Sequence, residues 1–403
     1  MSLSHSHSHL QSHWLDIIGI SEDGLEGLSP KARACLENAD HIFGAQRHLD
    51  LAQIKGTPWP IPFSIAPLLA KKGNKCVALV SNDPFWYGAG RAIADALPPS
   101  QWRAWPIASS FSQAASLLGW SLEDVICKAL HATPFTHILR DLQHDNRLLL
   151  TMRDGEAVKV FWSWLVEQNF TQSRIHILEC LGGEKQRHRS FTLSDIPPED
   201  ISHPVLVALE VKGIGLPLHN GLDDAHFISD GQMTKSPFRA LALRALMPHE
   251  GEILWDLGAG TGTISVEWCL SGQKMQAYAV EHNLSRYENI KANAHKFGLE
   301  HRLHPIQGQS LDKIDSLPAP HAIFIGGGAT QPLIDAAWQR LSQGGRLVIH
   351  AVTFETETLL QQCLQHYGGD MMRIDIAHSE PLGSKMAWQS TRPIVEWRVV
   401  KSC

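Results

Sequence analysis

Short apolar runs alternate along the chain with longer segments in which apolar residues recur at helical spacing. This alternation predicts buried strands joined by crossover helices, the pattern of α/β folds with parallel sheets. In the first half, Ser29 and Pro30 supply an N-cap and a first-turn proline for a helix that we expect to end near Asn38. The strands expected in this half cover residues 14–20, 76–81, 102–107, 147–151, 174–180 and 205–211.

The second half repeats the alternation and predicts a second α/β series. Gly298 follows one of its helices, where glycine readily takes the left-handed conformation that ends a helix. The strands expected here cover residues 253–257, 276–280, 303–306, 322–325, 346–350, 373–377 and 394–400. The helices expected here follow the first of these strands to about residue 270 and then cover residues 285–297, 332–341 and 355–367.

A segment rich in turn-forming residues separates the two halves. Residues 213–224 hold three glycines, a proline and two aspartates, a composition typical of a linker. A chain of 403 residues is long enough for two or three domains. We therefore expect a flexible His-rich tail over 1–13, a first domain over 14–212, a linker over 213–225 and a second domain over 226–403.

The overall charge and the cysteines exclude several classes of protein. The chain has 35 Lys and Arg against 41 Asp and Glu, a net charge of −6, which argues against a nucleic-acid partner. No apolar run reaches the roughly 18 residues of a membrane-spanning helix. The seven cysteines are odd in number and lack C-x-x-C spacing, which predicts reduced thiols in a cytoplasmic protein. The Ser-His tail is interpreted as flexible, and no metal site is assigned.

The strongest motif is a glycine-rich loop between a predicted strand and a predicted helix. It has the form D-x-G-x-G-x-G from Asp256 to Gly262. Glycines at such a loop let a ligand lie against the backbone, and the carboxyl ends of the strands are where doubly wound sheets bind ligands. The candidate cofactor-binding residues of this loop are Gly258, Ala259, Gly260, Thr261 and Gly262.

Glu281 ends the next predicted strand and can accept hydrogen bonds from two ribose hydroxyls. Two nucleoside ligands fit this arrangement. A nicotinamide dinucleotide requires G-x-G-x-x-G, and Thr263 stands where the third glycine would be. S-adenosylmethionine has no pyrophosphate and tolerates the observed spacing, so we favour it over a dehydrogenase cofactor and over a turn without a ligand.

Further loops are expected at the same edge of the sheet. Gly326 to Gly328 follow a buried strand, and Gly308-Gln309-Ser310 could border the adenine. Thr234 and Lys235 precede the first helix of the domain and could lie over the cofactor, although helix capping alone would also explain them. No catalytic triad, H-E-x-x-H motif or Walker loop is present.

The combination of motifs resembles known families. Residues 226–403 resemble the methyltransferase and decarboxylase domains of cobalamin biosynthesis, and residues 14–212 resemble the tetrapyrrole methylase superfamily. The first resemblance rests on the stretches Asp230–Lys235, Leu254–Gly262, Val266–Trp268, Phe324–Gly328 and Ala351–Glu357. The second rests on Ile18–Leu25, Leu28–Pro30, Ala39-Asp40 to Gly44, Val80–Pro84, Gly119-Trp120, Leu178-Glu179 and Gly182-Gly183.

The resemblance implies a tetrapyrrole methylase fold of two α/β subdomains, followed by a doubly wound, Rossmann-like class I methyltransferase domain with antiparallel edge strands. It implies two S-adenosylmethionine sites. The first domain would methylate carbon 5 of a corrin precursor, precorrin-6B, and the second would methylate carbon 15 and decarboxylate the acetate on carbon 12. The second site would use Thr234, Gly258 to Gly262, Glu281 and Gly308, and the first would use Gly19, Asp83, Ser109 and Ser110. The expected partners are the tetrapyrrole and further copies of the chain.

Some positions depart from the superfamily pattern. Asn82-Asp83-Pro84 stands where G-D-P is usual, and the stretches 130–133 and 151–154 also differ from it. These departures leave open a first domain without activity, and the loop motif alone leaves open another methyl acceptor such as RNA. The candidates for a proton donor in decarboxylation are Lys235, His350, Glu355 and Glu357, and none of them is assigned a catalytic role.

Overall fold

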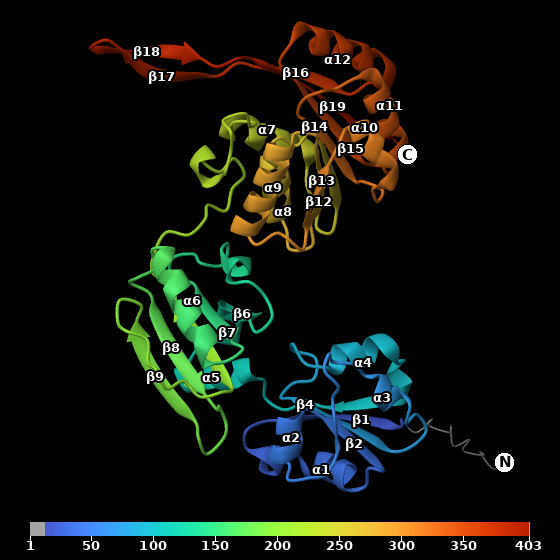
Figure 1. The fold of residues 1–403 in the computed structure, drawn as a ribbon, viewed down its shortest axis with the longest axis vertical. Helices are drawn as coiled ribbons and strands as arrows, with labels where there is room; N and C mark the ends of the chain where they lie inside the picture. The colour runs from blue at the N-terminus through green and yellow to red at the C-terminus, as the bar shows by residue number, and fades with distance from the viewer. Residues whose placement is uncertain (1–12, 403) are drawn as a thin grey trace, which may run out of the picture. The chain divides into compact units, whose positions relative to one another are not determined.

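The computed structural model describes residues 13–402, so the tail expected over residues 1–13 lies outside the described residues except for its last position. The chain divides into two compact units, one ending at Gly215 and the other beginning at Leu216 (Figure 1). Among the described residues, no helix is both long and apolar enough to cross a membrane.

The first unit begins with a parallel five-stranded sheet in the order β3-β2-β4-β1-β5. The strands predicted over 14–20 and 102–107 and the helix predicted from Ser29 are confirmed. The Ser29 side chain accepts the N–H of Ala32 as an N-cap. The elements of this part are β1 (Leu15–Ile20), α1 (Pro30–Glu37), β2 (His41–Gly44), α2 (Gln46–Leu51), β3 (Thr57–Pro58), α3 (Ala66–Leu69), β4 (Cys76–Ser81), α4 (Gly90–Ala96) and β5 (Trp102–Trp105).

The second sheet of this unit has the order β6-β7-β10-β8-β9 and corrects the expectation of parallel sheets throughout. β10 runs antiparallel to β7 and β8, and β9 runs antiparallel to β8. The connection from β8 to β9 is too short for a crossover helix, so these neighbouring strands must be antiparallel. The elements are α5 (Ser110–Leu118), β6 (Val125–Ala129), β7 (Arg147–Thr151), α6 (Gly155–Glu167), β8 (Arg174–Glu179), β9 (Arg187–Thr192) and β10 (Val205–Glu210).

The second unit is built on a seven-stranded sheet in the order β13-β12-β11-β14-β15-β19-β16. Its first five strands are parallel, and β19 and β16 add antiparallel edge strands, as expected for this fold. The strands are β11 (Ile253–Leu257), β12 (Gln276–Glu281), β13 (Leu303–Gln307), β14 (Ala322–Ile325), β15 (Arg346–Ala351), β16 (Asp370–Ile374) and β19 (Ile394–Val400). Between β16 and β19 the chain forms a hairpin that was not predicted, β17 (Ala377–Leu382) with β18 (Lys385–Ser390).

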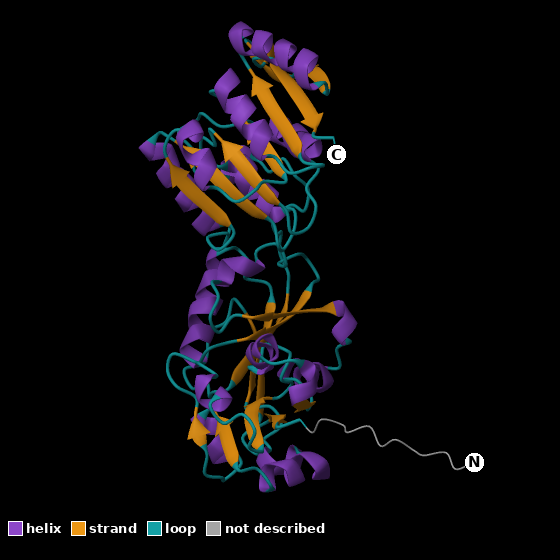
Figure 2. Cartoon of the chain, turned by 90° about the vertical axis from the view of Figure 1, so that its right-hand side faces the viewer, coloured by secondary structure: helices purple, strands orange, loops and turns teal. Residues whose placement is uncertain are grey.

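Helices cover both faces of this sheet (Figure 2). α7 (Ser236–Leu246), α8 (Thr263–Leu270) and α9 (Leu284–Lys296) pack in one apolar core, which includes the buried Trp268. α11 (Gln331–Arg340) and α12 (Phe354–Tyr367) pack in a second core around Trp255 and Trp397, and a short α10 (Ser310–Lys313) precedes α11. The ends of the parallel strands therefore form an edge at which loops can meet over the sheet.

The segment expected as a linker is only partly a connection. From Leu216 onward it groups with the second unit, and Leu222 is buried in that unit's core. The carboxylate of Glu267 accepts the backbone N–H groups of Gly221 and Leu222, so buried hydrogen bonds hold this stretch. A composition rich in Gly, Pro and Asp thus marks a turn-rich packed segment here.

Candidate active site

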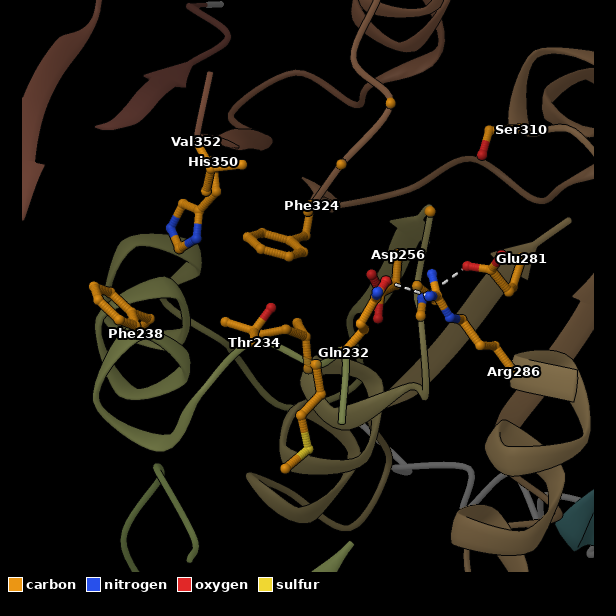
Figure 3. Close-up of a pocket in the computed structure, with 18 of the residues that line it drawn as sticks. Gln232, Thr234, Phe238, Asp256, Glu281, Arg286, Ser310, Phe324, His350 and Val352 are labelled. Carbon is orange, nitrogen blue, oxygen red and sulfur yellow. Dashed lines mark hydrogen bonds between the residues drawn. The ribbon is translucent and has the colours of Figure 1, made fainter. Parts of the chain in front are cut away.

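A cavity of about 830 Å³ lies at the carboxyl ends of the parallel strands of the second unit (Figure 3). One end is lined by the glycine loop after β11, by Glu281 at the end of β12 and by the loop after β13. The other end is lined by apolar side chains together with His350. The lining residues are Gln232 to Lys235, Phe238, Asp256, Gly258 to Gly260, Ile264, Glu281, His282, Arg286, Gln309 to Leu311, Phe324, Gly326 to Gly328, Thr330, Leu333, His350, Val352, Thr391, Arg392 and Ile394.

The three glycines of the loop have positive φ and different surroundings. A Cβ on Gly258 would lie 2.7 Å from the carbonyl oxygen of Gly327, and one on Gly262 would lie 3.0 Å from the Ile290 side chain. A Cβ on Gly260 would instead meet only the carbonyl oxygen of Gln232, at 3.7 Å. Gly258 and Gly262 therefore permit close packing within the protein, whereas Gly260 leaves space beside its backbone at the cavity.

Glu281 fixes the glycine loop to the neighbouring strand. Its carboxylate accepts the N–H of Gly260 at Oε2, at 2.9 Å, and the N–H of Asn283 at Oε1, at 2.8 Å. The side chain is buried and lines the cavity. Nδ1 of His282 also lies 3.1 Å from Oε1. A carboxylate has about four acceptor directions, so these neighbours still leave room for a ligand's hydroxyl group.

Asp256, the first residue of the motif, was not predicted as a site residue. Its side chain is fully buried, lines the cavity and accepts a 2.7 Å hydrogen bond from the hydroxyl of Ser265. Burial raises the pKa of Asp256 to about 7, and the nearby carboxylate of Glu281 acts in the same direction.

A buried arginine holds the segment that carries Thr234 over the cavity. Arg239 on α7 is fully buried and pairs with Glu267 on α8 at 2.8 Å. The same guanidinium binds the carboxylate of Asp224 at 2.8 Å and donates to the carbonyl oxygen of Thr234. A buried ion pair needs such additional hydrogen bonds to offset its lost hydration, and here they fix the path of the chain before α7.

The structure gathers most, though not all, of the residues predicted for this site. Thr234, Gly258, Ala259, Gly260 and Glu281 line the cavity. Thr261 and Gly262 do not line it, because Thr261 is buried under α9, where Asn293 holds its carbonyl oxygen. Gly308 is not a lining residue either; its N–H donates to the carbonyl oxygen of Glu281, and the next three residues line the cavity.

The apolar end of the cavity contains residues that sequence reasoning did not assign. His350 lies near the end of β15 and packs edge-to-face on Phe324, with ring centroids 5.0 Å apart. Its predicted place at a strand end had already made it a candidate proton donor, because strand ends line this edge. Arg392 and Ile394 follow the unpredicted hairpin, so no signal pointed to them. Glu355 and Glu357 do not line the cavity.

In the first unit, Asn82 lies against two of the four predicted residues, Gly19 and Ser110. A Cβ on Gly19 would overlap the carbonyl oxygen of Asn82, and Asn82 takes a positive φ of 47°. The Asn82 side chain donates a 2.6 Å hydrogen bond to the hydroxyl of Ser110. Asp83 and Ser109 serve local turns, since Asp83 accepts the N–H of Phe85 and Ser109 caps α5.

Two buried acceptors in the first unit were missed. Asn82 Oδ1 and Gln113 Oε1 have no partner among the described residues, although the amide nitrogen of Gln113 donates to Ser21 at 3.1 Å. Asn82 follows β4 next to Gly19 and bonds to Ser110, and Gln113 lies on α5 with Ser110. Buried polar atoms without a protein partner are typical of ligand sites.

Comparison with known proteins agrees with this geometry. Residues 15–197 match the family of tetrapyrrole (corrin/porphyrin) methylases, and residues 225–401 match the precorrin methyltransferase domain family. Both halves of the chain thus match methyltransferases of tetrapyrroles. The chain belongs to the precorrin-6Y C(5,15)-methyltransferase (decarboxylating) family, and this membership decides against the dehydrogenase alternative.

Relatives with that name match the whole chain. One from Sinorhizobium sp. is 38% identical over 411 residues, covering 99% of both chains. One from Mycobacterium tuberculosis is 32% identical over 395 residues, covering 96% of this chain and 99% of its own. The crystal structure of the C-terminal domain of precorrin-6Y C5,15-methyltransferase from Rhodobacter capsulatus is 45% identical, covers 46% of this chain and 100% of its own, and has a TM-score of 0.45.

Proposed function

We propose that this chain is a bifunctional, S-adenosylmethionine-dependent C-methyltransferase of a corrin precursor. The first unit methylates carbon 5 of precorrin-6B. The second methylates carbon 15 and removes carbon dioxide from the acetate on carbon 12, giving precorrin-8. The observation that carries this proposal is the cavity of the second unit, which joins a glycine loop and Glu281 at one end to an apolar end with His350, and which is also lined by Lys235 and Arg392.

The residues at the glycine end fit S-adenosylmethionine. The open space beside Gly260 accommodates a ligand against the backbone, and the buried carboxylate of Glu281 retains acceptor capacity for ribose hydroxyls. Thr234 and Gln309 to Leu311 complete this end. When bound, the cofactor supplies an electrophilic methyl group on a sulfonium.

The chain's own contribution to methyl transfer is placement of the acceptor carbon. The apolar side chains Phe238, Phe324 and Ile394 provide a surface for a flat macrocycle. Lys235 and Arg392 line the same cavity and can pair with its carboxylate side chains. Holding the acceptor carbon in line with the methyl group supplies much of the barrier reduction.

A second cofactor site in the first unit is part of this proposal. The cluster of Gly19, Asn82 and Ser110, with the unpartnered acceptors on Asn82 and Gln113, supports it. Asn82 adopts the left-handed conformation that the usual glycine would take, so this departure from the superfamily pattern is compatible with the same loop.

We also propose that the protein is cytoplasmic and assembles from copies of the same chain. The cysteines among the described residues have no disulfide partners, which supports a reducing compartment. The hairpin β17–β18 projects from the second unit in Figure 1 and exposes Leu382, Met386 and Trp388. A two-stranded ribbon is barely stable alone, and most soluble oligomers are closed assemblies of identical chains.

Mass spectrometry of the products from precorrin-6B and S-adenosylmethionine tests the function. We expect a gain of two methyl groups and the loss of one carbon dioxide. One methyl gained with carbon dioxide lost would mean that the first unit is inactive. No change in precorrin-6B, with labelled methyl groups appearing in RNA, would support the alternative acceptor.

A further inference from the structure

His350 and Glu396 form a buried pair at the apolar end of the cavity. They stand opposite each other on the antiparallel strands β15 and β19. His350 Nε2 lies 2.9 Å from Glu396 Oε2, and their exposed fractions are 4% and 2%. Because a carboxylate only accepts, the ring must carry a proton on Nε2, and this hydrogen bond fixes the orientation of the imidazole.

The other ring nitrogen is buried and has no partner among the described residues. Nδ1 of His350 belongs to a side chain that lines the cavity, and Figure 3 shows the ring beside Phe324. A buried polar atom without a partner costs about 1–3 kcal/mol. A pair that only joined two strands would not need a buried nitrogen without a partner. The geometry therefore indicates that His350 acts on a ligand.

The surroundings of the ring suit a reaction in which a carboxylate is lost. Phe238, Phe324, Val352 and Ile394 make this end apolar, and it can hold neutral carbon dioxide. Lys235 and Arg392 line the same cavity and can bind the macrocycle's other carboxylates. Arg392 forms no ion pair with any described residue, whereas Lys235 lies 3.6 Å from the carboxylate of Asp224.

We propose that His350 is the catalytic proton donor of the decarboxylation and that Glu396 positions it. This assignment rests on the proposed function. As the bond between the methylene carbon and the carboxylate carbon of the acetate breaks and carbon dioxide leaves, its electron pair goes to the methylene carbon. In the same step the proton on Nδ1 of His350, whose ring then carries protons on both nitrogens, moves to that carbon, which becomes a methyl group, and the ring regains its proton from solvent.

The other candidates fit this role less well. The Lys235 side chain is about half exposed, and Glu355 and Glu357 do not line the cavity. Asp256 lines the cavity, but its carboxyl is hydrogen-bonded to Ser265 beside the glycine loop. Of these groups, His350 alone combines a donor atom without a protein partner, a fixed ring and an apolar setting.

Two variants of the full-length protein test the proposal. His350→Gln places an amide near the Nε2 position, so contact with Glu396 is kept while the Nδ1 group is removed. Glu396→Gln keeps the hydrogen bond and removes the charge. His304→Asn is the matched control. His304 lies on β13, is half-buried beside Tyr278 of β12 and does not line the cavity. The readouts are carbon dioxide release, S-adenosylmethionine affinity, melting temperature and deuterium content of the new methyl group in mixed H2O and D2O.

For His350→Gln we expect carbon dioxide release to slow by about a hundredfold or more, the usual contribution of a general acid. For Glu396→Gln we expect about tenfold or more, since hydrogen bonds to charged groups contribute about 1.5–3 kcal/mol. Cofactor affinity and melting should match the wild type, and the isotope preference of the residual protonation should change in His350→Gln. A merely structural role would leave that preference unchanged.

Release of carbon dioxide by a folded His350→Gln protein at the wild-type rate would overturn the assignment. If that variant does not fold, Glu396→Gln decides: slower release with unchanged cofactor affinity supports the proposal, and wild-type release overturns it. A wild-type protein that releases no carbon dioxide from precorrin-6B would refute the proposed function instead, so the two failures are distinguishable.

Discussion

The backbone N–H of Gly260 donates a 2.9 Å hydrogen bond to Oε2 of Glu281, so the glycine loop and the end of β12 form one bonded unit. The same carboxylate accepts the N–H of Asn283 through its other oxygen. Glu281 therefore fixes the conformation of the glycine loop, and both line the same cavity. A change at Glu281 is therefore expected to affect both the cofactor site and the loop itself.

We predict that Glu281→Gln weakens binding of S-adenosylmethionine to the second unit by about tenfold or more, because charge-assisted hydrogen bonds are worth about 1.5–3 kcal/mol. An amide has one oxygen where the carboxylate has two, so either Gly260 or Asn283 loses its acceptor and the melting temperature should fall slightly. Calorimetric titration measures the affinity. Glu288→Gln is the control, since Glu288 is exposed on α9 and pairs only with Lys291. Equal affinities for the two variants would contradict the assignment of Glu281.

The open space beside Gly260 gives a second prediction. Gly260→Ala should lower the affinity of the second site strongly, because its methyl group would occupy the ligand's side of the loop. Its backbone cost should be about 1–2 kcal/mol, as for any non-glycine residue in the left-handed region. Gly344→Ala is matched, since Gly344 also has a positive φ and nothing within 4 Å of its Cβ position. Equal losses of stability with affinity lost only in Gly260→Ala would support the assignment, and unchanged affinity in Gly260→Ala would contradict it.

The strands with strong apolar runs were predictable, and the site was predictable only in part. Cys76–Ser81 and Ile253–Leu257 have the predicted bounds, because continuous apolar runs fix buried strands. The parallel direction predicted for all strands was wrong in the second sheet of the first unit, because an apolar run carries no information on strand direction. The hairpin at 377–390 was missed because its first strand, β17, lacks apolar alternation and includes Pro381.

The long-range pairing of strands explains why other parts of the site could not be predicted from the sequence. His350 and Glu396 are 46 positions apart, and only the register of β15 on β19 brings them together. The motif also does not separate the roles of its glycines, and the cofactor roles of Thr261 and Gly262 stay predictions. Gly262 serves the close approach of Ile290, a packing requirement that the sequence pattern does not distinguish from ligand binding.

The raised pKa of Asp256 gives a pH prediction. Its folded-state pKa is about 7 against 3.8 for the ordinary group, so the native state binds the proton more tightly than the unfolded chain. The resulting stability is fully present below the ordinary pKa and is lost as pH rises through about 7. Asp256→Asn should therefore reduce the loss of stability between about pH 5 and about pH 8 by at least about 1 kcal/mol.

Pulse-labelling hydrogen exchange of the β11 peptide, followed through denaturation, measures how the stability of the second unit changes with pH. Asp315→Asn is the control, because Asp315 is almost fully exposed. A pH dependence in Asp256→Asn equal to that of the wild type would contradict the prediction.

The contact between Gly19 and Asn82 predicts the requirements of the first site. Any Cβ at Gly19 would overlap the carbonyl oxygen of Asn82, so Gly19→Ala must force apart the ends of β1 and β4. We expect calorimetric stoichiometry to fall from two bound S-adenosylmethionine molecules to one, with loss of carbon 5 methylation. Gly73→Ala has a positive φ and open space around its Cβ position, and it should retain both sites. Two sites of wild-type affinity in Gly19→Ala would contradict this placement of the first site.

The exposed hairpin predicts how copies of the chain associate. Met386 and Trp388 are two residues apart on β18, so they share one face of the ribbon, and they are paired with Pro381 and Ser379 on β17. Their exposed fractions are 63% and 78%, unusual for large apolar side chains that share a face. We expect Trp388→Ser combined with Met386→Ser to lower the molar mass measured by light scattering, because the apolar face that would be covered by another copy is lost.

Ile196→Ser is the matched control for the hairpin variant. Ile196 is 86% exposed in the first unit, so its replacement removes a comparable exposed apolar side chain away from the hairpin. It should leave the molar mass unchanged. Because Thr391 and Arg392 follow β18 directly and line the cavity, dissociation through the hairpin should also raise the KM for the tetrapyrrole. A hairpin variant with the wild-type molar mass would show that association, where it occurs, uses another surface.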